Sequence, residues 1–251
     1  MAKDQLHWVY GIHAAQTLLK SRPEQVAEIR VTKGRNDQRL TKIQQLAEKH
    51  GIACTQVSKS ALQQLFPDQT DANLQDVAVL CAQHQLYDER FLEKLLSDIS
   101  TPLLLVLDGV TDPHNLGACL RSADAAGVHA VIVPKDRSAG ITPVVSKVAC
   151  GAAETMPFVV VTNLARTLRM LQQQGVWIVG TAGEAEQSLY QSNLNGPLAL
   201  VMGAEEKGLR RLTREHCDLL VKLPMAGSVS SLNVSVATGV CLFEVVRQRG
   251  G

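Results

Sequence analysis

The chain of 251 residues is long enough for one large domain or two modest ones. Hydrophobic residues make up 45% of it and charged residues 20%, a balance that excludes a disordered tail and a coiled coil. The chain has 25 Lys and Arg residues and 24 Asp and Glu residues, so its net charge gives no sign of nucleic-acid binding. Any contact with nucleic acid must therefore use a local basic patch.

The first 82 residues predict a small α/β domain in which short strand-like and helix-like segments alternate. Strands are expected at 28–31, 52–57 and 77–81, and helices at 37–50 and 59–66. Ser58 can cap the second of these helices. Residues 83–101 are mostly polar with scattered apolar positions, and they predict a helical linker that ends near Pro102. A second domain is expected over residues 102–251.

Continuous apolar runs alternate with helical stretches throughout this second domain. The runs cover residues 103–107, 130–133, 158–161, 176–179, 198–202 and 219–223. Strands that are buried on both faces have this composition. The sequence therefore predicts an α/β fold with a mostly parallel sheet and helices on both of its faces. In such a sheet, ligands bind at the carboxyl ends of the strands, so the residues after each run are candidates for the site.

The last helix is expected to begin near Ser231, and one of its faces is apolar. That face carries Leu232, Val236, Val240, Phe243 and Val246 at helical spacing. The small residues Ser235, Ala237 and Gly239 let another backbone approach closely. A contact between subunits and packing within the monomer explain this face equally well.

Three polar clusters follow expected strands. In the first, Asn115 can cap a helix that carries Arg121 nearly two turns later, and the pair suits phosphate or ribose oxygens. In the second, Gly203 and Gly208 flank Glu205, and glycine permits a close approach of ligand to backbone. An ordinary strand-to-helix turn with a surface arginine, or a glycine turn with a solvated glutamate, would give the same patterns.

The third cluster spans residues 223–235 and joins the last strand to the last helix. Its small residues leave backbone N–H and C=O groups available to an adenine and a ribose. Ser231 and Asn233 add a hydroxyl and an amide at the start of the helix. An elaborate helix cap is an equally good explanation.

Other patterns narrow the choice of function. Neither a dinucleotide-binding nor an NTP-binding glycine motif is present, and no G-x-S-x-G elbow presents a serine nucleophile. The six cysteines and seven histidines do not show the spacing of metal ligands, so we expect reduced, mostly buried thiols and no metal.

No apolar run approaches the roughly 20 residues that cross a bilayer. The N-terminal ten residues are polar, and we expect a cytoplasmic protein. Basic patches at 33–39, 135–137 and 207–214 are either RNA contacts or solvated surface.

Taken together, the three clusters resemble motifs of the SpoU/TrmH (SPOUT) family of RNA ribose 2′-O-methyltransferases. The matching elements are Asn-x5-Arg at Asn115 and Arg121, Gly-x-Glu at Gly203 and Glu205, and Pro-Met…Ser-Leu-Asn-Val-Ser within 224–235. Residues 9–14 and the pattern after them are similar to a small RNA-binding domain, itself similar to ribosomal protein L30e, that precedes the catalytic domain in some members.

The resemblance implies a fold, a reaction and a set of site residues. The fold would be a parallel sheet with a C-terminal trefoil knot, in a homodimer whose active site is completed across the subunits. The reaction would transfer a methyl group from S-adenosylmethionine to a guanosine ribose in the peptidyl-transferase loop of 23S ribosomal RNA, without a metal. Transfer RNA as the substrate, or a role in RNA binding or ribosome assembly without catalysis, are the alternatives.

The residues that the resemblance assigns fall into two groups. The catalytic group comprises Asn115, Arg121, Glu205, Ser231 and Asn233. The cofactor-binding group comprises Thr181, Gly203, Leu223, Met225 and Leu232. Two departures from the family pattern stand out: members often carry His-Gln-Gly where this chain has residues 74–76, and a glycine where it has Glu206. The first departure predicts an altered RNA contact, and the second predicts a reshaped cofactor loop.

Overall fold

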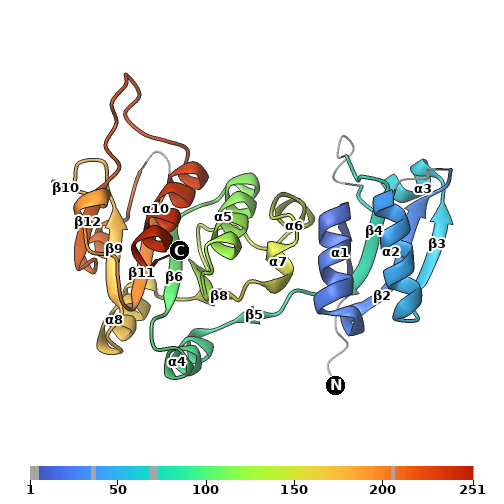
Figure 1. Ribbon diagram of the computed structural model, residues 1–251, viewed down its shortest axis with the longest axis horizontal. Helices are drawn as coiled ribbons and strands as arrows, with labels where there is room; N and C mark the ends of the chain where they lie inside the picture. The colour runs from blue at the N-terminus through green and yellow to red at the C-terminus, as the bar shows by residue number, and fades with distance from the viewer. Residues whose placement is uncertain (1–5, 35–37, 68–72, 205–206, 251) are drawn as a thin grey trace. The chain divides into compact units, whose positions relative to one another are not determined.

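The computed structural model describes residues 6–34, 38–67, 73–204 and 207–250 (Figure 1). Two compact units make up the chain. Unit 1 consists of Met1–His84 together with Ile141–Thr155, and unit 2 consists of Gln85–Gly140 together with Met156–Gly251. Glu205 and Glu206, which the sequence places in the cofactor loop, lie outside the described residues.

Unit 1 contains a four-stranded sheet in the order β1-β4-β2-β3, with β2 and β3 parallel and the other neighbours antiparallel. Its strands are β1 (Leu6–Tyr10), β2 (Val26–Thr32), β3 (Ala53–Val57) and β4 (Val77–Ala82). Its helices are α1 (Ile12–Ser21), η1 (Pro23–Gln25), α2 (Gln38–Lys49), α3 (Lys59–Gln63), α6 (Pro143–Val148) and α7 (Ala152–Thr155). The expected α/β domain is confirmed. The Ser58 hydroxyl accepts a hydrogen bond from the Ala61 N–H at 3.1 Å, so the expected cap is also present.

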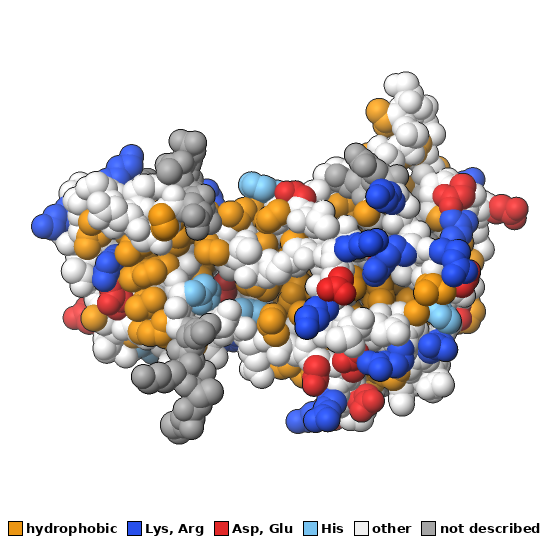
Figure 2. All heavy atoms as spheres, turned by 180° about the vertical axis from the view of Figure 1, so that it is seen from behind, with side chains coloured by type: hydrophobic (Ala, Val, Ile, Leu, Met, Phe, Trp, Pro, Cys, Tyr) orange, Lys and Arg blue, Asp and Glu red, His pale blue; other side chains and the backbone are white. Residues whose placement is uncertain are grey.

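The alternation of side chains along the strands gives the sheet of unit 1 two different faces. On one face Val9, Ile29 and Val79 are buried beneath α1 and α2. On the other, Tyr10 and Phe66 meet edge to face, and other hydrophobic side chains gather at the surface (Figure 2). The core of this unit thus lies between the sheet and its two long helices.

The structure places residues 74–76 in the fold of unit 1, and the altered RNA contact stays a prediction. Leu74 is buried in the cluster around Tyr10, so this side chain packs in the core. The Gln75 side-chain oxygen accepts a hydrogen bond from the Ile12 N–H at 3.0 Å and ties this segment to the start of α1. Asp76 has a φ of 65°, a conformation that glycine adopts without strain. The residues at this position thus shape the fold of unit 1.

A buried histidine makes the stability of unit 1 depend on pH. Burial, together with the nearby charges of Arg22 and His7, lowers the pKa of His84 from 6.5 to about 4. Its two ring nitrogens have no hydrogen-bond partner among the described residues. Between pH 6.5 and 4 the unfolded chain therefore binds a proton that the folded chain does not, and the free energy of unfolding falls as the pH falls.

We expect urea unfolding to show this loss when wild type is compared with His84→Phe at pH 7.5 and 4.5. The wild type should lose about 2 to 3 kcal/mol more than the variant, because the phenylalanine cannot take up the proton. The same loss of stability in both proteins would contradict this role of His84.

Unit 2 is built on one eight-stranded sheet, in the order β10-β12-β9-β11-β6-β7-β8-β5. Every neighbouring pair is parallel. The strands are β5 (Leu86–Tyr87), β6 (Leu103–Asp108), β7 (Ala130–Pro134), β8 (Phe158–Val161), β9 (Trp177–Thr181), β10 (Gln187–Ser188), β11 (Leu198–Gly203) and β12 (Leu219–Lys222). The predicted parallel sheet is confirmed. The trefoil knot stays a prediction.

Helices cover both faces of this sheet, as predicted (Figure 1). Leu104 and Val106 of β6 pack with α4 (Glu89–Asp98) and α8 (Leu164–Gln173) on one face. Their alternating neighbours face α5 (Pro113–Ala125) and α10 (Val234–Gln248), which pack against each other. The 3₁₀ helix η2 (Leu189–Gln191) and α9 (Arg211–Glu215) complete the unit. In the part of the chain that the structure describes, no helix has the length and apolar character needed to cross a membrane.

Two expected elements differ in the structure, while the domain boundaries stay a prediction. The linker 83–101 is not wholly helical, because β5 precedes α4 and pairs with β8 at the edge of the sheet. The last helix begins at Val234 and not near Ser231, because the Asn233 side chain accepts a hydrogen bond from the Ser235 N–H at 2.9 Å and caps the helix there.

Candidate functional site

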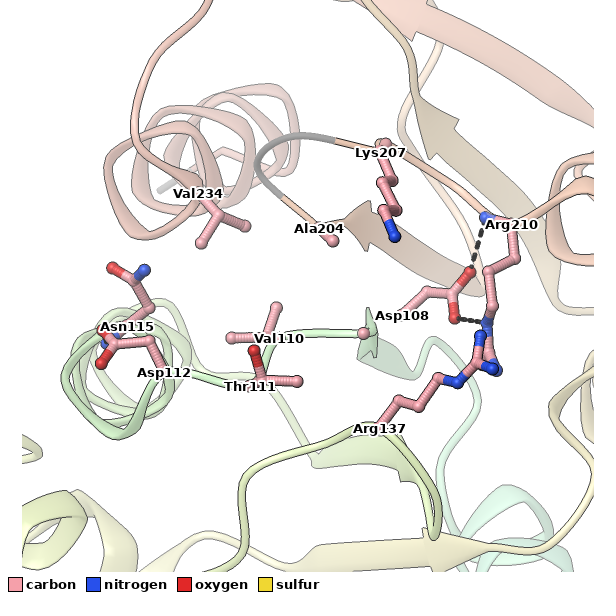
Figure 3. Close-up of a pocket in the computed structure, with 12 residues that line it drawn as sticks. Asp108, Val110, Thr111, Asp112, Asn115, Arg137, Ala204, Lys207, Arg210 and Val234 are labelled. Atoms are coloured by element: carbon pink, nitrogen blue, oxygen red, sulfur yellow. Dashed lines mark hydrogen bonds and ion pairs between the residues drawn. The ribbon is translucent and has the colours of Figure 1, made fainter.

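The polar clusters meet at the carboxyl edge of the sheet in unit 2. Strands β9, β11 and β6 are neighbours, and β12 lies beside β9. The loops that follow β6 and β11 therefore lie side by side, and the first turn of α10 lies next to them (Figure 3). This edge is where a parallel sheet binds ligands.

A small pocket of 310 Å³ lies where β9 and β11 end. Thr181, Gly203 and Leu232, three of the five residues assigned to the cofactor, line it. The Thr181 hydroxyl donates a hydrogen bond to the Val201 carbonyl at 3.3 Å, which fixes this side chain against β11. Leu223 and Met225 follow β12 and are not among the residues that line the small pocket. The structure thus joins residues from β9, β11 and the loop before α10 in one cavity.

Gly203 allows the loop after β11 to fold back on the strand. The Ala204 N–H donates to the Gly208 carbonyl at 3.2 Å, and the Gly208 N–H donates to the Ala204 carbonyl at 2.9 Å. A Cβ atom at Gly203 would lie 2.3 Å from the carbonyl carbon of Gly208 and 2.5 Å from the backbone nitrogen of Leu209. Because both atoms belong to the backbone, no side-chain movement relieves the clash. Only glycine fits at residue 203.

A larger pocket of 550 Å³ adjoins the first, and we call it the large pocket. The loop after β6, from Asp108 to Asn115, forms one side of it, and Arg137, Lys207 and Arg210 provide its cationic groups (Figure 3). The two pockets share four lining residues, which are Ala204, Lys207, Gly208 and Val234. The two pockets are therefore neighbours at the end of β11 and the start of α10.

The sequence did not single out the ion pair that anchors this loop. The Asp108 side chain is fully buried, and its two oxygens accept hydrogen bonds from the Arg210 N–H at 3.0 Å and the Arg210 Nε at 2.5 Å (Figure 3). A buried carboxylate requires such partners. The pair fixes the end of the loop to the end of β6. A carboxylate at the end of a wholly apolar strand is the signal that could have revealed it.

Asn115 and Asn233, both assigned to catalysis, are in direct contact. The Asn233 Nδ2 donates to the Asn115 Oδ1 at 2.9 Å, and this bond links the first motif to the third. The sequence predicts Asn115 as the N-cap of α5, and this prediction is wrong. Asp112 has that role, since its side chain accepts from the Asn115 N–H at 2.9 Å. Asn115 therefore directs its side chain to α10 from the first turn of α5.

Arg121 and Ser231 are placed differently from the two asparagines. Arg121 lies on the exposed surface of α5 and is not among the residues that line either pocket. Six residues along an α-helix turn a side chain about 120° away from the starting direction, so Arg121 and Asn115 face different ways. Ser231 is exposed in the loop before α10. Among the described residues, no group of three or more His, Cys, Asp and Glu side chains could hold a metal ion.

Two family models match the chain. The model of the SpoU rRNA methylase family matches residues 102–243, and the model of RNA 2′-O ribose methyltransferase substrate binding matches residues 8–87. Together they cover both the small N-terminal domain and the parallel sheet.

Relatives of known function and a solved structure are similar over almost the whole chain. The 23S rRNA (guanosine-2′-O-)-methyltransferase RlmB of Pseudomonas putida is 60% identical over 246 residues, which are 98% of this chain and 98% of the relative. RlmB of Escherichia coli K12 is 58% identical over 242 residues, which are 96% of this chain and 98% of the relative. The SpoU methyltransferase AviRb from Streptomyces viridochromogenes, solved in complex with the cofactor AdoMet, has the same fold. It gives a TM-score of 0.78 at 23% identity over 97% of this chain and 90% of that one. This chain belongs to the SpoU rRNA methylase family.

Proposed function

We propose that this protein transfers a methyl group from S-adenosylmethionine to the ribose 2′-hydroxyl of a guanosine in the peptidyl-transferase loop of 23S ribosomal RNA. The observation that carries the proposal is the pair of adjoining pockets at one sheet edge, with one compartment for a donor and one for a nucleotide. Relatives at 58–60% identity over nearly the whole chain support the choice of RNA. We also propose that the protein is located in the cytoplasm, where 23S ribosomal RNA is found.

The same proposal assigns functions to segments of the chain. Residues 1–82 form the RNA-binding domain, residues 83–101 the linker, and residues 102–251 the methyltransferase domain. The match of residues 8–87 to a substrate-binding model supports the first of these assignments.

The small pocket fits the donor. Its volume of 310 Å³ lies at the lower end of the range for small-molecule sites, and the loop with Gly203 gives it a backbone wall. We assign Thr181, Gly203 and Leu232 to its lining, with Leu223 and Met225 contributing from the loop after β12. S-adenosylmethionine supplies a methyl group that is attacked in line by the ribose oxygen. The residues of the chain must therefore align the two partners and lower the cost of removing the hydroxyl proton.

The large pocket suits an RNA nucleotide because its cationic groups are arranged around one end. Arg137 and Lys207 offer charge to a phosphate, whereas the charge of Arg210 is paired with Asp108, and Asn115 lies at the other side of the cavity (Figure 3). In this proposal Asn115, Ser231 and Asn233 hold the ribose in place. The hydrogen bond from Asn233 to Asn115 gives this set a defined geometry before RNA binds.

Arg121 acts by charge in this proposal. A guanidinium remains protonated in proteins, so it is a poor acceptor for the hydroxyl proton. Arg121 instead binds a substrate phosphate and stabilises the negative charge that develops on the oxygen, while Glu205 or that phosphate takes the proton. Because Arg121 does not line the pockets of its own chain, we assign it to the site of a second copy.

An apolar face of α10 supports the dimer. Val236 is 52% exposed and Phe243 is 50% exposed, whereas Thr238, Cys241 and Leu242 on the opposite face are buried in unit 2. Packing within the described part of the same chain therefore does not account for this face. We propose that it joins two copies of the chain.

Replacing Phe243 with aspartate should dissociate this dimer, because a carboxylate would have to be buried among apolar side chains. We expect the dimer dissociation constant to rise at least about 100-fold in sedimentation equilibrium, which corresponds to roughly 3 kcal/mol. The matched control is Leu212→Asp, since Leu212 is 51% exposed on α9 and lies outside this face. A monomeric wild type would contradict the dimer, and equal behaviour of the two variants would contradict its assignment to this face.

Transfer of tritium from labelled S-adenosylmethionine tests the reaction. Purified protein should label 23S ribosomal RNA and leave transfer RNA unlabelled. Labelling of transfer RNA alone would favour the other substrate of the family. Binding of ribosomal RNA without transfer would favour an assembly factor and contradict catalysis.

A further inference from the structure

Unit 1 contains a groove of 550 Å³ between α1 and α2, which we call the α1–α2 groove. Lys20 of α1 and Arg39, Lys42 and Lys49 of α2 supply its charged groups. The remaining lining consists of one histidine, two glutamines and two aliphatic residues, so no acidic side chain among the described residues lines the groove. This balance differs from that of the whole chain, whose net charge is only +1.

Helical spacing brings these charges into one stripe. Arg39, Lys42 and Lys49 follow each other at intervals of three and seven residues, so they lie along one side of α2. The stripe is about 15 Å long, given a rise of about 1.5 Å per residue. Leu40 and Ile43 of α2 are buried in the core, which fixes the rotation of the helix and leaves Lys42 and Lys49 exposed.

The lysines of the groove lack ion-pair partners in the structure. In the described ranges, no carboxylate lies within ion-pair distance of Lys20, Lys42 or Lys49, and all three side chains are exposed. Like charges that gather without counter-charges reduce the stability of the fold. The arrangement is therefore better suited to binding an anion than to stabilising unit 1.

We infer that the α1–α2 groove binds the sugar–phosphate backbone of the RNA substrate without reading its sequence, an inference that rests on the proposed function. A chain of phosphates matches a linear stripe of cations, because each lysine acts as a point charge toward one phosphate. Gln16 and Gln45, which also line the groove, add amide donors for phosphate or ribose oxygens. Both helices lie within the residues matched by the substrate-binding model.

The groove also accounts for one of the basic patches found in the sequence. Arg39, at the end of the patch 33–39, lines the groove at the start of α2. The patches 135–137 and 207–214 contribute Arg137, Lys207 and Arg210 to the large pocket of unit 2. Each unit thus carries a cavity with basic side chains, although Asp108 and Asp112 also line the one in unit 2. We assign the cavity in unit 1 to affinity and the cavity in unit 2 to positioning of the target nucleotide.

The double variant Lys42→Gln/Lys49→Gln tests the inference in the full-length protein. Filter binding of a 23S ribosomal RNA fragment, from 50 to 200 mM salt, should give affinity about tenfold below wild type. The slope of log K against log salt should fall by about 1.4, which corresponds to two lost contacts with single-stranded phosphates. In methyl transfer, KM for RNA should rise about tenfold with kcat and the affinity for S-adenosylmethionine unchanged.

The matched control is Lys59→Gln/Lys94→Gln, which removes the same charge from exposed lysines outside the groove. Wild-type binding and an unchanged salt slope in the groove variant, or equal losses in both variants, would overturn the inference. Failure of this inference can be distinguished from failure of the proposed function. A wild type that binds RNA but transfers no methyl group would contradict the proposed reaction only, because the difference in binding between the two variants is measured without catalysis.

Discussion

Replacing Gly203 with alanine will raise the dissociation constant for S-adenosylmethionine at least about 100-fold. The added Cβ would lie 2.3 Å from the carbonyl carbon of Gly208 and 2.6 Å from its oxygen, well inside van der Waals contact. Relief of that clash requires the two backbone hydrogen bonds between Ala204 and Gly208 to break, and both of these residues line both pockets. Overpacking of this kind costs about 3 kcal/mol, which corresponds to roughly 100-fold in affinity.

Gly140→Ala is the matched control for this change. Gly140 lines neither pocket of unit 2, and a Cβ atom there would meet no heavy atom within 4 Å. We expect isothermal titration calorimetry to give wild-type affinity within about twofold for this variant. Circular dichroism should show that both variants are folded. If Gly203→Ala binds the donor as tightly as Gly140→Ala does, the small pocket is not the donor site.

Arg121→Ala should reduce kcat for methyl transfer about 100- to 1,000-fold, which is the usual effect of removing one group that stabilises a developing oxyanion. Affinity for S-adenosylmethionine should not change, because Arg121 does not line the small pocket. Arg121→Lys should keep part of the activity, since the positive charge remains. Complete loss of activity in Arg121→Lys at every pH, with RNA binding intact, would count against stabilisation by charge alone.

A mixing experiment decides whether Arg121 serves the site of the second copy. Arg121→Ala and Gly203→Ala are each expected to be inactive. If Arg121 acts across the dimer, a heterodimer of the two variants has one site with a normal donor pocket and a normal arginine. Random mixing then restores about one quarter of wild-type activity, because half of the dimers are mixed and half of their sites are intact. Mixtures without activity would place Arg121 at the site of its own chain.

The main strands were predictable because burial on both faces leaves a continuous apolar run. β6 and β7 are buried at every residue, and the runs 103–107 and 130–133 mark both of them. Strands β1, β5 and β10 were missed, and for β5 and β10 the reason is that two residues are too few to show a pattern. Residues 141–155, whose helices pack in unit 1, carry no signal of that placement, because the contacts are with residues far away in the sequence.

In the site, too, local features could be predicted from the sequence, and contacts between distant residues could not. Pro113 directly after Asp112 is a signal for a helix that starts there, and it should have favoured Asp112 over Asn115 as the cap. The pair of Asp108 and Arg210, in contrast, joins residues 102 positions apart, and only the folded sheet brings them together. The bond between Asn115 and Asn233 has the same origin. The motifs identified candidate residues, and the folded sheet brings the segments that carry them together at one edge.

The most direct test of the account is a map of 2′-O-methylated riboses in 23S ribosomal RNA from cells with and without the gene for this protein. We expect a single guanosine in the peptidyl-transferase loop to lose its methyl group in the deletion strain and to regain it with the wild-type gene, but not with the gene for Gly203→Ala. An unchanged methylation map in the deletion strain, or full restoration by the Gly203→Ala gene, would contradict it.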